Sequence, residues 1–303
     1  MADDHDLPAR LAAFDFLEEQ TQRHGDALPR ATLEKGFVHD GRRIPLLGPQ
    51  GIFKPAAMEL PLSLTTAPVV GGRPRPYEDE ITKDGLIAYR YRGSEPLHRD
   101  NVGLRRAMAG RTPLVYFFGL VPGQYAAAWP SFVVADDPSS LTFTIAADEP
   151  HTLTGTTTDA AAEPIRRRYA TGLQLHRLHQ AEFRQRVVRA YHQACAICRL
   201  RHDELLDAAH ILPDGHPLGE PTVPNGLALC KLHHAAFDRN IVGIRSDLVV
   251  EVSLEVLHEI DGPMLIHGLQ GWHGAPLQVP RPLEDRPNPD FLAERYEVFR
   301  RAG

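Results

Sequence analysis

The sequence predicts an α+β protein with two globular units, a sheet-rich N-terminal domain with flanking helices and a smaller C-terminal domain that binds metal. Three observations lead to this prediction. The chain has 303 residues, and domains usually contain about 100 to 200. Short apolar runs broken by Gly and Pro fill residues 37–147, a pattern typical of strands. All three cysteines fall between Cys195 and Cys230, which indicates a metal site rather than a set of disulfides.

The overall composition excludes several classes of protein. The hydrophobic fraction of 43% and the charged fraction of 24% are average for globular domains, and no run approaches the ~18 apolar residues of a membrane-spanning helix. Residues 1–6 are acidic and lack the apolar segment of a secretory signal. Three cysteines cannot all pair, which suits a reducing compartment. We therefore expect a cytoplasmic protein without a membrane segment.

The first part of the chain is expected to contain a helical segment followed by a sheet-rich domain. Apolar residues at helical spacing predict an amphipathic helix over residues 7–24, and a second short helix follows at 28–35, so residues 1–36 form a helical segment. A further helix is predicted at 101–109. The strand-length apolar runs of the domain over residues 37–147 are 44–53, 86–91, 114–120, 131–135 and 141–145.

Residues 148–164 are rich in Thr and Ala without apolar periodicity, and we interpret them as a linker to a C-terminal domain over residues 165–303. That domain begins with a basic segment and a helix at 180–191. Nine arginines and only two acidic residues occur between Glu163 and Arg201, although the whole chain carries a net charge of −6. The planar guanidinium suits phosphate, whereas a solvated helix in an arginine-biased sequence is the alternative. The arginines that we expect to contact the DNA backbone are Arg166, Arg167, Arg168 and Arg184.

Two short motifs predict a structural zinc site. Cys195-Ala-Ile-Cys198 is followed, after 31 intervening residues, by Cys230-Lys-Leu-His233. Each motif can place two ligands on one tight turn, and two such turns build the tetrahedral site that zinc prefers. We therefore expect one Zn²⁺ bound by three thiolates and one imidazole.

The residues between and after these motifs resemble the HNH nuclease family, over about residues 167–247. A histidine ends the first predicted strand, an asparagine follows a loop, and a second histidine lies on a helix. The resemblance implies a ββα-metal fold in which His210 is the general base, Asn225 orients it, and His234 binds a catalytic divalent cation such as Mg²⁺ or Mn²⁺. Phosphodiester hydrolysis needs a base with a near-neutral pKa, which imidazole supplies, and a cation that stabilises charge on phosphate.

The second protein ligand of this cation is left open by the sequence. Asp238 lies four residues after His234, so the two side chains share one face of a helix. Asp207 is another carboxylate close to the base. Many members of the family carry a ligand directly before the catalytic histidine, but here that residue is Ala209. Asp238 and Asp207 are therefore both candidates, and for Asp238 a plain surface carboxylate is the alternative.

A second resemblance concerns the N-terminal domain. Tyr77 precedes an acidic run that ends at Glu80, and Tyr91 opens a Tyr-Arg-Gly turn before the predicted helix. This order is similar to that of the SRA (SET- and RING-associated) domain, a PUA-like curved sheet that flips a modified cytosine out of the duplex. The resemblance implies that Tyr77 and Tyr91 sandwich the extruded base while Asp79 or Glu80 reads its edge. The alternative is that Tyr77 caps a strand, Tyr91 is a core residue and Asp79 belongs to a turn.

Together these features predict a modification-dependent DNA endonuclease of the type IV-like, McrA-like restriction class. It would recognise 5-methylcytosine or 5-hydroxymethylcytosine in duplex DNA by base flipping and cut with a one-metal HNH centre. Because one centre cuts one strand, we expect a homodimer or transient pairing on DNA. The alternatives are an HNH endonuclease that reads another mark, such as phosphorothioate, and a non-catalytic zinc-containing DNA-binding module.

Overall fold

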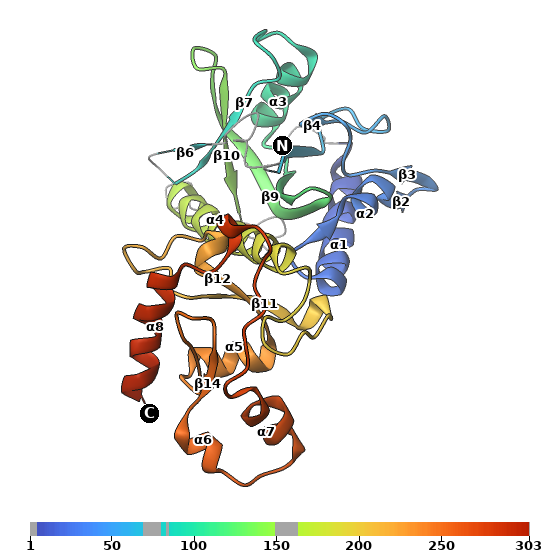
Figure 1. Cartoon of the computed structure of the whole chain (residues 1–303). Coiled ribbons are helices and arrows are strands. Elements are labelled where there is room, and N and C mark those ends of the chain that lie inside the picture. The colour runs from blue at the N-terminus through green and yellow to red at the C-terminus, as the bar shows by residue number, and fades with distance from the viewer. Residues whose placement is uncertain (1–4, 69–79, 83–84, 149–162, 303) are drawn as a thin grey trace. The chain divides into compact units, whose positions relative to one another are not determined.

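The computed structural model describes residues 5–68, 80–82, 85–148 and 163–302 (Figure 1). Contacts divide the chain into two compact units, Met1–Ala181 and Glu182–Gly303. The boundary lies inside the long helix α4 (Glu163–Ala190), because Leu178 is buried in the core of the first unit whereas Val187 is buried in the core of the second. Most of the predicted linker, residues 149–162, lies outside the described residues.

The first unit is a mixed α+β fold around one curled, half-barrel sheet. Eight of its strands form this sheet in the order β4-β5-β8-β9-β10-β7-β6, with β1 paired to β9, while β2 and β3 form a separate hairpin. All neighbours are antiparallel except β5 and β8. The elements before α4 are α1 (Leu7–His24), β1 (Leu28–Pro29), α2 (Arg30–Lys35), β2 (Phe37–His39), β3 (Arg42–Ile44), β4 (Ile52–Phe53), β5 (Ser63–Thr66), β6 (Glu80–Ile81), β7 (Ile87–Arg90), α3 (Arg99–Gly110), β8 (Leu114–Val121), β9 (Gln124–Asp137) and β10 (Thr142–Ala147).

The central strand β8 explains why the sheet is covered on both faces. All eight of its residues are buried, as the continuous apolar run Leu114–Val121 requires. Since side chains alternate along a strand, Tyr116 and Phe118 enter one core, which α3 and the first part of α4 share. Phe117 enters the other core, which α1 and α2 close. The predicted helices over residues 7–24 and 101–109 are confirmed as α1 and α3.

One strand prediction is wrong. The run over residues 44–53 is not a single strand: Ile44 ends β3, and only residues 52–53 form β4. Pro45 and Pro49 lie between these two strands. Proline has no amide hydrogen to donate to a ladder, so the chain crosses from one strand to the other as a loop, and this loop forms one wall of the pocket described below.

The second unit contains two small antiparallel sheets and several helices (Figure 1). After α4, its elements are η2 (Asp203–Leu205), β11 (Leu206–His210), η3 (Val223–Asn225), β12 (Gly226–Cys230), α5 (Lys231–Asp238), β13 (Val242–Ile244), β14 (Val250–Val252), α6 (Leu254–His258), α7 (Pro263–Gly268), η4 (Gln270–Trp272), η5 (Leu283–Asp285) and α8 (Pro289–Ala302). In the part of the chain that the structure describes, no helix is long and apolar enough to cross a membrane.

The strand pair β11–β12 followed by α5 is the framework of the candidate active site. His210, the last residue of β11, pairs with Gly226, the first residue of β12. Glycine is needed at position 226 because a Cβ atom there would lie 2.4 Å from the Val187 side chain and 3.0 Å from the Phe183 ring. The missing side chain lets the end of α4 pack directly on β12.

Candidate active site

The predicted zinc ligands form one compact cluster. The ligand atoms of Cys195, Cys198, Cys230 and His233 all lie within 4.8 Å of one another. Cys198 Sγ is 3.9 Å from Cys230 Sγ, and zinc bound at about 2.3 Å from two sulfurs in a tetrahedral site places them about 3.8 Å apart. Cys230 Sγ lies 3.1 Å from His233 Nδ1. The donor set and its spacing therefore fit Zn²⁺.

A contact outside the cluster selects which histidine nitrogen faces it. His233 Nε2 donates to the Gly268 carbonyl at 2.9 Å, which fixes the ring and leaves Nδ1 toward the sulfurs. Gly268 ends α7, far along the chain from the two cysteine motifs. Sequence reasoning missed this partner, since a backbone carbonyl has no signature in the sequence.

His210 lies half-buried against an aromatic ring. Its ring stacks on Phe183 with centroids 4.1 Å apart and an interplanar angle of 21°. Burial lowers the pKa of His210, and the nearby His234 lowers it further, although Asp214 and Asp238 act in the opposite direction. Nε2 is buried and has no hydrogen-bond partner among the residues that the structure describes. Burial thus favours the neutral imidazole, the form that a general base needs.

The sequence analysis expected Asn225 to orient the His210 ring, but the structure shows no hydrogen bond between these two side chains among the residues it describes. The Asn225 side chain is fully buried and bonds only backbone groups in the described structure: Oδ1 accepts from the Leu212 amide at 2.9 Å, and Nδ2 donates to the Leu212 and Glu220 carbonyls. The Asn225 carbonyl also accepts from the Ile211 amide. Asn225 therefore fixes the chain immediately after His210, and its effect on the base passes through the backbone.

His234 lies between the two carboxylates that the sequence left as alternatives. Its Nδ1 is 3.4 Å from Asp207 Oδ2, and its Nε2 is 3.3 Å from Asp238 Oδ2. The hydrogen bond with Asp207 raises the pKa of His234 despite burial. Imidazole nitrogen and carboxylate oxygen are donors that a divalent cation accepts, so this group fits the predicted catalytic ion.

Other charges distinguish Asp207 from Asp238. Lys231 Nζ donates to Asp207 Oδ2 at 2.6 Å, and Arg184 Nε lies 3.7 Å from Asp207 Oδ1. Burial favours a higher pKa for Asp207, but the hydrogen bonds from His234 and Lys231 lower it to about 2. Asp207 is thus already neutralised by cationic side chains, whereas 60% of the Asp238 side-chain surface is exposed.

The arginines expected on the DNA backbone have partners within the chain. Arg166 and Arg167 form ion pairs with the buried Asp148, at 3.0 and 3.3 Å. Arg184 donates to the carbonyls of Leu206 and Asp203. Arg168 is exposed. Arg166, Arg167 and Arg184 therefore have structural roles, which the residue pattern alone did not reveal.

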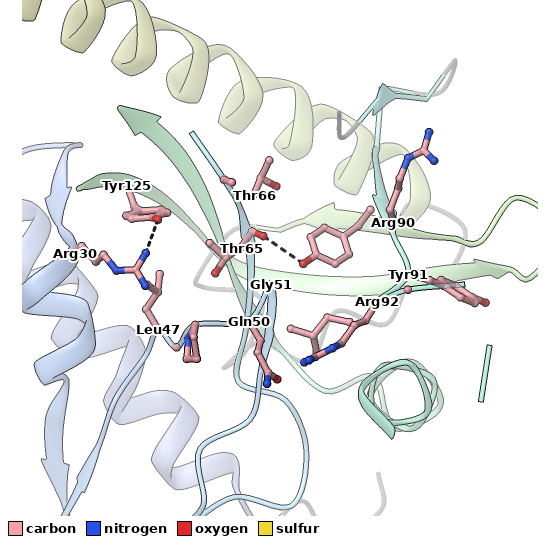
Figure 2. Close-up of a pocket in the computed structure, with 16 residues that line it drawn as sticks. Arg30, Leu47, Gln50, Gly51, Thr65, Thr66, Arg90, Tyr91, Arg92 and Tyr125 are labelled. Carbon is pink, nitrogen blue, oxygen red and sulfur yellow. Dashed lines mark hydrogen bonds between the residues drawn. The ribbon is translucent and has the colours of Figure 1, made fainter. Parts of the chain in front are cut away.

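A pocket of about 380 Å³ opens in the first unit (Figure 2). The loop before β4 forms one wall, and β5, β7 and β9 supply the others. Tyr89 lies at this pocket and donates to the Thr65 carbonyl at 3.3 Å. Arg30 donates to the Tyr125 hydroxyl at 3.1 Å on another side, a bond drawn in Figure 2. The pocket combines tyrosine rings, hydroxyls and guanidinium groups, and its volume suits one small planar group.

The residues proposed to sandwich a base are placed only in part. Tyr77 and Asp79 lie outside the described residues, and Glu80 lies in β6. Tyr91 lines the pocket but is 4% exposed. Its ring packs on the Phe143 ring with centroids 4.5 Å apart, and the Arg105 guanidinium lies 5.2 Å from the centre of the Tyr91 ring. The Tyr91 hydroxyl donates to Asp136 and accepts from Arg105. A base can stack on Tyr91 only if part of this packing rearranges.

The family comparison agrees with the geometry of the second unit. Residues 195–245 match the family described as HNH endonuclease. This stretch contains the zinc cluster, His210, Asn225, His234 and Asp238. The C-terminal unit therefore carries an HNH endonuclease domain, and the chain is a metal-dependent DNA nuclease.

Two solved structures are similar to the chain at low identity. The modification-dependent TagI restriction endonuclease has 18% identity over 78% of this chain and 81% of that chain, with a TM-score of 0.32. The type IV phosphorothioation-dependent restriction endonuclease ScoMcrA has 15% identity over 61% of this chain and 51% of that chain, with a TM-score of 0.23. No curated protein sequence matches the chain significantly.

Proposed function

We propose that this protein is a modification-dependent DNA endonuclease in which the N-terminal unit reads a mark and the C-terminal unit hydrolyses the backbone. The observation that carries the proposal is the geometry of the HNH motif, which contains both the half-buried His210, stacked on Phe183, and His234, flanked by two carboxylates. The separate pocket of the first unit supplies a place where a mark can be recognised.

Each residue of the active site has a distinct task in this proposal. His210 takes the proton from the attacking water, and Asn225 holds the backbone that follows it. His234 and Asp238 bind the divalent ion, which stabilises negative charge on the phosphate and the leaving oxygen. Asp207 and Lys231 keep the His234 ring in its orientation. The cluster of three cysteines and His233 holds the structural Zn²⁺.

The mark that we propose first is 5-methylcytosine or 5-hydroxymethylcytosine, flipped into the pocket of an SRA-like domain over residues 37–147. Aromatic side chains near the pocket support this, because extruded bases are held by stacking and by hydrogen bonds to their edges. In the proposal Tyr77 and Tyr91 stack on the extruded base after part of the packing around Tyr91 rearranges, and Asp79 or Glu80 lies at the base edge. The second candidate is a phosphorothioate, and the observation that favours it is the presence of Arg30, Arg90 and Arg92 around the same pocket.

The proposal also covers the arrangement of the chain. We propose residues 148–164 as the linker, residues 165–303 as the nuclease domain, and a homodimer or transient pair on duplex DNA, since one centre cuts one strand. We infer a cytoplasmic location, because three free thiols that bind zinc need a reducing compartment.

The test is cleavage of four otherwise identical plasmids that carry cytosine, 5-methylcytosine, 5-hydroxymethylcytosine or phosphorothioate linkages. We expect cutting of a marked plasmid with Mg²⁺ or Mn²⁺ and little cutting of the unmarked one. Preference for the phosphorothioate plasmid would select the second candidate. Equal cutting of all four would overturn the modification-dependent function and leave a nuclease without a reader.

A further inference from the structure

The C-terminal helix α8 packs against the part of the nuclease that contains Asp238. Leu292 and Phe299 are buried in this contact. Gly243 in β13 makes room for it, because a Cβ atom there would lie 2.4 Å from the Phe299 ring. Just before α8, the Asn288 amide donates to the Pro224 carbonyl at 2.9 Å, next to Asn225. The helix is thus fixed on β13 and on the loop that holds the base.

From this helix, Arg295 reaches the C-terminal end of α5. Its guanidinium donates to the Phe237 carbonyl at 2.5 Å and to Asn240 Oδ1 at 2.6 Å. It also lies over the Phe237 ring, 4.5 Å from the centre. Phe237 is buried, so the ring and carbonyl that Arg295 contacts are held in place. The two hydrogen bonds hold the backbone immediately before Asp238 and the side chain two residues after it.

Asp238 needs such support because of its position in the helix. It is the last residue of α5, a helix of only eight residues. The final turn of a helix frays easily, and here it is closed by long backbone hydrogen bonds of 3.2 Å, from the Arg239 amide to the Ala235 carbonyl and from the Asn240 amide to the Phe237 carbonyl. The Asp238 side chain is 60% exposed, and its Oδ2 lies 3.3 Å from His234 Nε2. The direction of its carboxylate therefore depends on the backbone that Arg295 fixes.

We propose that Arg295 is a positioning residue for the catalytic ion: by capping the end of α5, it holds Asp238 at the distance from His234 that ion binding requires. This inference rests on the proposed function, in which His234 and Asp238 bind the ion. It assigns the C-terminal helix, which follows the residues matched to the HNH family, an indirect part in ion binding, through the position of Asp238.

The experiment measures Mn²⁺ binding to the zinc-loaded full-length protein without DNA, from the electron paramagnetic resonance signal of free Mn²⁺. Arg295→Met keeps most of the aliphatic packing and removes both hydrogen bonds. We expect it to weaken Mn²⁺ binding about tenfold, the lower end of what loss of a residue behind a metal ligand costs. Zinc content should stay unchanged, and saturating Mn²⁺ should restore the rate of DNA cleavage. Arg295→Lys, which keeps one donor, should recover part of the affinity.

Two further variants make the outcomes distinct. Arg300→Gln, an exposed arginine on the same helix, is the matched control and should bind Mn²⁺ as the unchanged protein does. Asp238→Asn tests the ion site itself. If Asp238→Asn weakens Mn²⁺ binding but Arg295→Met does not, the inference on Arg295 is wrong while the ion site stands. If neither weakens it, the assignment of Asp238 in the proposed function is wrong. A loss in Arg295→Met that saturating Mn²⁺ does not restore would show a purely structural role and overturn the inference.

Discussion

The active site of the C-terminal unit and the pocket of the N-terminal unit are assembled in different ways. The side chains of the candidate active site lie between Asp207 and Asp238, on the neighbouring elements β11, η3 and α5. The pocket draws on residues from Arg30 to Tyr125, which belong to a helix, to loops and to four strands of the sheet. A short strand pair and the helix after it hold the first site locally, whereas the second requires strands from across the whole sheet. The two sites should therefore respond differently to the same kind of change.

The largest effect is expected from loss of a zinc ligand. Cys198→Ser removes one of four ligands, and structural zinc sites contribute about 10 to 16 kcal/mol of apparent binding free energy in small domains. The C-terminal unit should lose its zinc and unfold, while the N-terminal unit keeps its sheet. Zinc analysis and limited proteolysis would show this. Arg199→Gln, in the same turn but outside the cluster, is the control. A folded Cys198→Ser protein with a full complement of zinc would contradict the assignment.

The next effect concerns the chemistry alone. His210→Ala should lower the rate of plasmid cleavage by about 10² to 10⁴-fold, the contribution of a positioned general base. DNA binding and zinc content should not change, since His210 is not in the zinc cluster. The exposed His202, changed to Gln, provides a control with full activity. Retained cleavage by His210→Ala with Mg²⁺ or Mn²⁺ present would remove His210 from the mechanism.

A smaller change in the pocket should affect recognition and leave the chemistry intact. In Gly51→Ala the new Cβ atom would lie 2.7 Å from the Tyr89 hydroxyl oxygen and 3.3 Å from the Thr65 carbonyl, so the pocket wall must shift. We expect binding of marked DNA to weaken by about tenfold, or ~1.4 kcal/mol. Binding of unmarked DNA, which depends on phosphate contacts, should hardly change.

The matched control for this prediction is Gly172→Ala, because Gly172 lies on α4 with open space around its Cβ position. Binding is measured at one fixed salt concentration on paired marked and unmarked oligonucleotides. If Gly51→Ala weakens both duplexes equally, the pocket supports the fold and does not read the mark.

The smallest effect is a displacement of the pH dependence. In the proposed mechanism His210 acts as the neutral base, and burial lowers its pKa below the usual 6.5. Cleavage should therefore decrease only as the pH falls through this lowered pKa, so the acidic limb of kcat/KM lies below pH 6.5. Phe183→Leu removes the stacked ring, exposes the imidazole and should move the limb upward toward 6.5. A limb at or above pH 6.5 in the unchanged protein would contradict the buried, neutral base.

The contrast between a site built from neighbouring residues and a pocket built from distant ones also explains which features could be predicted from the sequence. Cys195, Cys198, Cys230 and His233 were predictable because the spacing of ligands along the chain already defines a tight turn. The strand at 114–120 was predictable because an unbroken apolar run must be buried on both faces. In both cases, the information is contained within a few neighbouring residues.

What the sequence did not reveal depends on contacts between distant segments. The partners of Asn225 are backbone groups of Leu212 and Glu220, which no side-chain pattern announces. Lys231 lies inside the zinc motif, but its contact with Asp207 appears only when β11 and α5 are brought together. The pocket around Tyr89 likewise requires the register of the whole sheet, which short motifs do not encode.

The zinc cluster has a topological consequence. Cys198 and Cys230 are separated by 31 residues, and this segment contains both His210 and Asn225. A zinc ion bound to the cluster therefore cross-links the two ends of the loop that carries the base and the residue supporting it. Closing a loop of this length removes conformational entropy from the unfolded chain worth about 4 kcal/mol, if a metal cross-link acts as a covalent one does. Zinc bound at this cluster would therefore tie together both ends of the segment that contains His210 and Asn225.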